Sequence, residues 1–93
     1  MGAIGSATLD FGGSLTQEGT IDIAGQAGLT TANHVEAFVM SETSVDHTTQ
    51  DHEMLANFTK FVCSVPVAGT LRILALVNGA LTSGRYTVRW VWT

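Results

Sequence analysis

Apolar and polar residues alternate through most of the chain, and no window of about 11 residues carries the apolar stripe of an amphipathic helix. A period of two places successive side chains on opposite faces of an extended strand. The pattern is clearest near the end of the chain, where alternate residues are large and apolar: Tyr86, Val88, Trp90 and Trp92. The sequence therefore predicts an all-β fold.

Turn signals divide the alternating segments into short strands. Asn78-Gly79 and Ser83-Gly84 are the clearest, because Asn and Gly tolerate the positive φ of tight turns. Turn signals about every 8–12 residues are typical of an antiparallel β-sandwich or a jelly-roll-like barrel. Residues 1–93 are expected to form one such domain, since a chain of this length builds a single modest core. The expected strands are residues 7–11, 20–24, 34–40, 53–65, 70–77 and 85–93.

Two of these strands are apolar on both faces, although an antiparallel sheet needs only one buried face. One explanation is contact between subunits. The other is a central position in a tightly curled barrel. We predict subunit contacts, made by the side chains opposite the core-facing ones: Phe38, Met40, Leu74 and Leu76.

The overall composition favours the same interpretation. Hydrophobic residues make up 45% of the chain and charged residues 13%, with a mean hydropathy of +0.27. Soluble domains carry roughly 25% charged residues. A chain this small cannot bury all its apolar side chains in its own core. We therefore expect another copy or a partner to cover part of its surface.

Residues 41–52 are the longest polar stretch and are expected to form a loop with at most one helical turn near Thr48–His52. An acid–histidine pair occurs twice, five residues apart. That spacing puts the pairs on opposite faces of a strand, or about 140° apart on a helix. One chain therefore does not gather both histidines around a metal. The residues that we predict to contact a partner are Asp46, His47, Asp51, His52 and Glu53.

Three roles for this stretch stay open. It can make polar hydrogen bonds within the loop or between subunits, which the sequence favours. It can recognise a partner. It can also bind a metal on the axis of a trimer, through three copies of His47 or of His52.

Tyr86, Trp90 and Trp92 share one face of the last expected strand. Aligned aromatic side chains can stack on sugars, which would make the domain a carbohydrate-binding module. In a β-domain they more often form the core. We therefore expect a core role, and keep glycan binding as the alternative.

Several classes of function are disfavoured. A net charge of −4 with four basic residues argues against nucleic acid. No apolar run is long enough to cross a membrane, and the first residues do not read as a signal peptide. Cys63 has no partner for an internal disulfide, which fits a reducing cytosol, and is expected to be a buried thiol. No nucleophile, phosphate-binding or metal motif occurs, so we expect neither catalysis nor a cofactor.

Five segments are distinctive as strings, namely Ala7–Gly12, Gly25–Leu29, His34–Phe38, Asp46–Glu53 and Thr87–Trp92. In these segments and their order, residues 6–93 resemble a group of short proteins encoded among the virion genes of tailed bacteriophages. The resemblance implies a virion structural protein, assembled in the host cytoplasm, in a capsid decoration, tail fibre or collar. The implied partners are further copies, as a homotrimer, and other virion proteins. In this context, the alternative to a structural role is a carbohydrate-binding module at a fibre tip that recognises the host.

Overall fold

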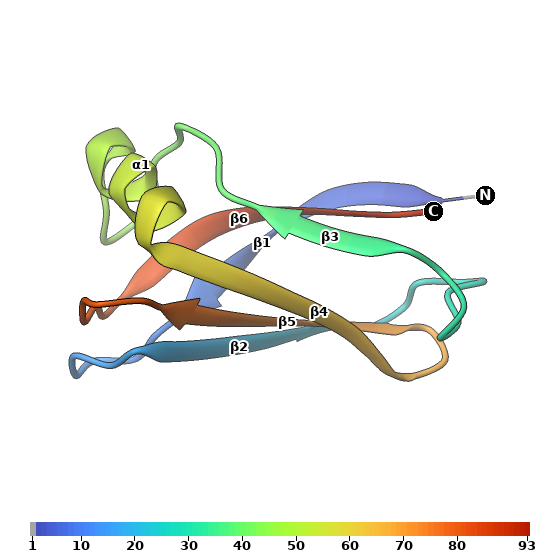
Figure 1. The fold of residues 1–93 in the computed structure, drawn as a ribbon. Helices are drawn as coiled ribbons and strands as arrows, with labels where there is room; N and C mark the ends of the chain where they lie inside the picture. Colours follow the sequence, from blue (N-terminus) through green and yellow to red (C-terminus); the bar gives the residue numbers. More distant parts are fainter. Residues whose placement is uncertain (1) are drawn as a thin grey trace.

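The computed structural model describes residues 2–93, whose strands form two three-stranded antiparallel sheets packed as a sandwich (Figure 1). The elements in chain order are β1 (Ala3–Asp10), β2 (Glu18–Ile23), β3 (Val35–Phe38), α1 (Thr49–Phe58), β4 (Thr59–Val67), β5 (Thr70–Val77) and β6 (Arg85–Trp92). One sheet has the strand order β1-β6-β3 and the other β2-β5-β4. The predicted all-β antiparallel fold is confirmed, as a sandwich rather than a closed barrel.

The centre of each sheet supplies most of the core. Strands β5 and β6 are each hydrogen-bonded to a strand on both sides. Their alternate residues point between the sheets, as the period of two predicts. The buried side chains of these two strands are Leu71, Ile73, Ala75, Val77, Tyr86, Val88, Trp90 and Trp92. Burying one such apolar side chain stabilises the fold by about 1.5–3 kcal/mol.

The segment before β4 differs from the sequence-based expectation. The predicted strand over residues 53–65 is wrong in its first part, because α1 continues to Phe58 and the strand begins at Thr59. The expected single helical turn is therefore a helix of 10 residues. That helix is neither long nor apolar enough to cross a membrane.

A capping box explains where this helix starts. The Thr48 side chain accepts a hydrogen bond from the Asp51 backbone N–H at 3.3 Å, and the Asp51 carboxylate accepts one from the Thr48 N–H at 3.2 Å. These contacts satisfy two helix-end donors. One turn on, His52 and Leu55 face the core and are buried. Two inward side chains three residues apart are enough to hold this short helix at one end of the sandwich (Figure 1).

Candidate functional site

The four residues predicted to contact a subunit lie on two different surfaces. Leu74 and Leu76 point outward from β5, since Ile73, Ala75 and Val77 face the core. Phe38 points outward from β3 in the other sheet, and Met40 lies two residues beyond it; each is about half exposed. The structure therefore brings Leu74 and Leu76 together but does not join them to Phe38 and Met40.

A third apolar residue completes the patch around Leu74 and Leu76. Val62 on β4 is the register partner of Leu74 and is 42% exposed, while Leu76 is 38% exposed. We call Val62, Leu74 and Leu76 the β5 patch. Sequence reasoning missed Val62, because the β4–β5 register that places it beside Leu74 follows from the hairpin and not from alternation alone.

Charged residues surround this patch. Leu76 is paired with Glu18 of β2 on one side and with Lys60 of β4 on the other. Beyond Leu74, Arg72 donates hydrogen bonds of 2.8 and 3.0 Å to the Asp22 carboxylate. This guanidinium lowers the pKa of Asp22 below its ordinary value. An apolar centre with a charged rim is the usual anatomy of a protein interface.

On the outer face of the β1-β6-β3 sheet, charged residues interrupt the apolar ones. Phe38 is the register partner of Arg89, and Ile4 that of Val91. Arg89 donates a hydrogen bond of 3.0 Å to Glu42, which lowers the pKa of that carboxyl. This ion pair belongs to the row that contains Phe38. Phe38 therefore has a charged register partner, and the one apolar pair of this face, Ile4 and Val91, lies in the next row.

The polar loop, residues 41–52, supplies hydrogen bonds to β6 that a neighbouring strand would otherwise supply. Strand β3 pairs with β6 only at residues 89–92, which leaves the backbone of Arg85 and Thr87 without a strand on that side. Side chains of the loop and of α1 bind these groups instead. The Arg85 N–H donates to Asp46 at 2.8 Å, the Ser44 hydroxyl donates to the Arg85 carbonyl at 2.5 Å, and the Thr87 N–H donates to His52 at 2.9 Å.

His52 is fully buried, and its two ring nitrogens have opposite roles. Its Nδ1 lies 2.9 Å from the Thr48 carbonyl oxygen, which only accepts, while its Nε2 accepts from the Thr87 N–H. The ring is therefore neutral and carries its proton on Nδ1. His52 was predicted to contact a partner; the structure places it inside the domain, with no exposed surface for such a contact.

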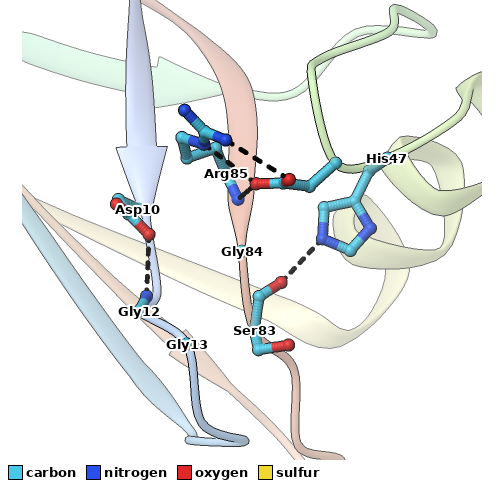
Figure 2. Close-up of a pocket in the computed structure, with 8 residues that line it drawn as sticks. Asp10, Gly12, Gly13, His47, Ser83, Gly84 and Arg85 are labelled. Carbon is cyan, nitrogen blue, oxygen red and sulfur yellow. Dashed lines mark hydrogen bonds and ion pairs between the residues drawn. The ribbon is translucent and has the colours of Figure 1, made fainter.

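His47 is placed differently. Its ring stacks on Tyr86 with centroids 3.8 Å apart. Figure 2 shows its Nε2 pointing to the Ser83 carbonyl oxygen, at 2.6 Å. Its Nδ1 lies 3.1 Å from the Asp51 carboxylate. Both neighbours are acceptors, so both contacts are satisfied together only when each ring nitrogen carries a proton. A metal at His47 would have to displace one of them, and no group of three metal-binding side chains occurs among residues 2–93.

Beside His47 lies an open pocket of about 440 Å³ (Figure 2). Its two carboxylates already have partners: Asp46 accepts a hydrogen bond of 3.0 Å from Arg85, and Asp10 accepts one from the Gly12 N–H. Arg85 also lowers the pKa of Asp46. Gly84 also lines the pocket, with a φ of +82°, and a Cβ there would lie 3.1 Å from atoms of Asp46 and His47. The carboxylates and the His47 ring of this pocket are therefore engaged in contacts within the chain.

The remaining predicted loop residues are on the outside. The Asp51 carboxylate is half exposed even though it contacts His47, and Thr48 and His47 lower its pKa. Glu53 is exposed and accepts a hydrogen bond from the Ser41 hydroxyl. These two carboxylates are the part of the predicted polar contact surface that a partner can reach most readily.

The aromatic residues of β6 belong to the core, as expected. Tyr86, Trp90 and Trp92 are between 4% and 7% exposed. The Trp92 indole N–H donates to the side-chain oxygen of Gln26 at 3.1 Å. None of the three offers an exposed ring face on which a sugar could stack.

The chain has no detected similarity to known families. No family model matches it, and searches of curated proteins and of solved structures found no match.

Proposed function

We propose that the protein is a structural component of a symmetric protein assembly, and that this assembly is the virion of a tailed bacteriophage. The observation that carries the assembly part is the β5 patch, three adjacent aliphatic side chains on the outer face of a sheet whose inner face already forms the core. The resemblance of segments such as Ala7–Gly12 and Asp46–Glu53 to virion proteins supports the phage part. A position in a decoration, fibre or collar follows from that resemblance.

Burial of the β5 patch by a partner would stabilise an assembly, but the patch is small. Complete burial of an aliphatic side chain stabilises by about 1.5–3 kcal/mol, so finishing the burial of Val62 or Leu76, each about 40% exposed, adds roughly 1 kcal/mol. Association must also offset the loss of translational and rotational freedom. The patch therefore needs polar contacts around it. Elsewhere, on α1, the exposed carboxylates of Asp51 and Glu53 are available to other virion proteins.

The experiment measures the mass of the purified protein by light scattering over a range of concentrations. The parent chain is expected to form an oligomer, and Leu74→Ser/Leu76→Ser is expected to be a folded monomer with an unchanged circular dichroism spectrum. The matched control is Ile4→Ser/Leu15→Ser, which makes the same chemical change at two exposed aliphatic residues outside the patch. A parent chain that stays monomeric, or a control that dissociates while the patch variant does not, contradicts the proposal.

The virion part has a separate test. Mass spectrometry of purified phage particles whose genome encodes this chain should detect the chain in a fixed ratio to the major capsid protein. If the particles lack the chain, the virion part of the proposal is wrong. Carbohydrate binding is not proposed, because the side chains it required, Trp90 and Trp92, are buried.

A further inference from the structure

Within residues 2–93, Glu18 and Lys60 are the two charged side chains that the fold leaves without partners. Every arginine holds an acid: Arg72 with Asp22, Arg85 with Asp46 and Arg89 with Glu42. The other four acids each contact a histidine, a hydroxyl or a backbone N–H. Among the described residues 2–93, Glu18 alone of the acids and Lys60 alone of the basic residues make no such side-chain contact.

These two residues occupy the same row of the β2-β5-β4 sheet. Glu18 and Lys60 are both register partners of Leu76, on its opposite sides, and all three point to the outer face. Their strands are two spacings apart, roughly 9.5 Å. To meet within one chain, the two side chains would have to fold over Leu76. The opposite charges therefore stand on either side of the β5 patch.

We propose that this outer face packs against the same face of a second copy, around a two-fold axis that runs along β5 in the plane of contact. The inference rests on the proposed function, for which it names the partner and the geometry. Such an axis lays β2 of one copy over β4 of the other. Glu18 of each copy then meets Lys60 of the second copy, and two equivalent ion pairs form.

The same axis also arranges the apolar residues. Leu74 and Leu76 lie on the central strand, so each meets its own equivalent near the axis. Thr20, the β2 partner of Leu74, lies over Val62 of the second copy. The contact is thus aliphatic at its centre and charged at both sides. One patch complements itself, as an isologous interface requires.

Arg72 is the residue for which this arrangement is least favourable, because its guanidinium approaches the guanidinium of Arg72 in the second copy. Its charge is already held by Asp22. Packed sheets cross at about −30°, so the axis is inclined by about 15° to β5, and strands that touch near Leu76 diverge with distance along β5. The crossing separates the two Arg72–Asp22 pairs and keeps the Glu18–Lys60 contacts close to the axis.

The opposite outer face lacks this complementarity. Its arginines, Arg85 and Arg89, are bound to acids of their own chain, and Phe38 lies in the row of the Arg89–Glu42 pair. A two-fold contact predicts a dimer as the basic unit, in place of the homotrimer that the resemblance to virion proteins implies. A trimer would require a different, head-to-tail contact.

Charge reversal tests the geometry. Glu18→Lys and Lys60→Glu are each expected to raise the dimer dissociation constant by about tenfold or more, because like charges then meet at both ends. Equimolar mixing of the two variants should restore a dimer of near-parent affinity, since each places the opposite charge against the other. The double variant Glu18→Lys/Lys60→Glu should also dimerise, because the pairs reform with their signs exchanged. Glu36→Lys, on the other sheet, is the matched control and should leave the dissociation constant unchanged.

Analytical ultracentrifugation distinguishes the outcomes. A parent dimer whose two weakened variants recover on mixing supports the two-fold contact. A trimer, or a dimer that is insensitive to these reversals, overturns the contact and leaves the assembly function standing. A parent chain that is monomeric at every concentration overturns both.

Discussion

The imidazole Nε2 of His52 accepts a hydrogen bond from the backbone N–H of Thr87 at 2.9 Å, so a side chain takes the position of a missing strand. The other ring nitrogen binds the Thr48 carbonyl at the start of α1. One buried ring therefore connects the helix to the central strand of a sheet. Because buried polar groups of this kind must be satisfied, the neutral ring with its proton on Nδ1 is part of the fold.

Replacing His52 by Leu should destabilise the domain strongly. Leucine fills much of the space but leaves the Thr87 N–H without its acceptor, while the Thr48 carbonyl keeps only the backbone N–H of residue 52 as a donor. An unsatisfied buried group costs about 1–3 kcal/mol, so we expect a loss of this size in the free energy of unfolding, measured by urea denaturation. His34→Leu makes the same change at a side chain that is 70% exposed and should cost less than about 0.5 kcal/mol. Equal losses at the two positions would show that the His52 contacts are energetically unimportant.

The sequence predicts the strands better than it predicts the role of the polar loop. Alternation in β5 and β6 follows directly from sheet geometry, so the inward residues Ile73, Val88 and Trp90 could be identified without a structure. The sequence indicates the start of the helix, where Thr48 and Asp51 have the spacing of a capping box, but not its length. A helix of 10 residues with two inward side chains shows little periodicity, so its second half resembles the beginning of a strand.

The functions of Asp46 and His52 could not be predicted, because they depend on where β3 ends relative to β6. Pairing stops at Phe38, and only then does the backbone of Arg85 and Thr87 need side-chain partners. The unpaired charges of Glu18 and Lys60 beside the β5 patch could not be predicted for a similar reason. Strand order and register place residues 18 and 60 on either side of Leu76, and neither can be read from alternation.

Gly5 is expected to be sterically essential. A Cβ at this position would lie 2.5 Å from Cζ2 of Trp90, so the ring packs against the bare backbone of β1. Gly5→Ala should destabilise by about 1–3 kcal/mol through overpacking and should alter the near-ultraviolet circular dichroism of tryptophan. Gly13→Ala is the control, because a Cβ there meets no atom within 4 Å. A Gly5 variant as stable as the Gly13 variant would mean that the tryptophan moves aside without cost.

The Cys63 thiol should react slowly in the native protein. Burial raises its pKa, with a smaller contribution from Glu36, and the thiolate is the nucleophile. Iodoacetamide at pH 8 should therefore alkylate the folded chain more slowly than the chain in denaturant, as followed by mass spectrometry. Glu36→Gln should raise the native rate slightly, since it removes the smaller cause and leaves burial in place. A native rate equal to the denatured one contradicts this prediction.

Acid should remove the stabilisation that the arginine pairs provide. Hydrogen bonds from Arg85 lower the pKa of Asp46 below its ordinary value of 3.8, and Arg89 does the same to Glu42 relative to 4.5. A carboxyl whose pKa is lower in the folded state stabilises above its unfolded pKa, and this stabilisation is lost as the pH falls through the folded value. The contribution of these two pairs to the melting temperature should thus be steady near neutral pH and fall below about pH 4.5.

Asp46→Asn assigns part of this acid sensitivity to one pair. At pH 7 the variant should melt below the parent, because the Arg85 guanidinium loses its charged partner and the Arg85 N–H loses its carboxylate acceptor. The difference should narrow as the pH drops and the parent carboxyl becomes protonated. It should also narrow in about 1 M salt, since the pair is exposed and the Debye length there is roughly 3 Å. A difference that stays constant from pH 7 to pH 2.5 would mean that Asp46 acts by its shape and hydrogen bonding and not by its charge.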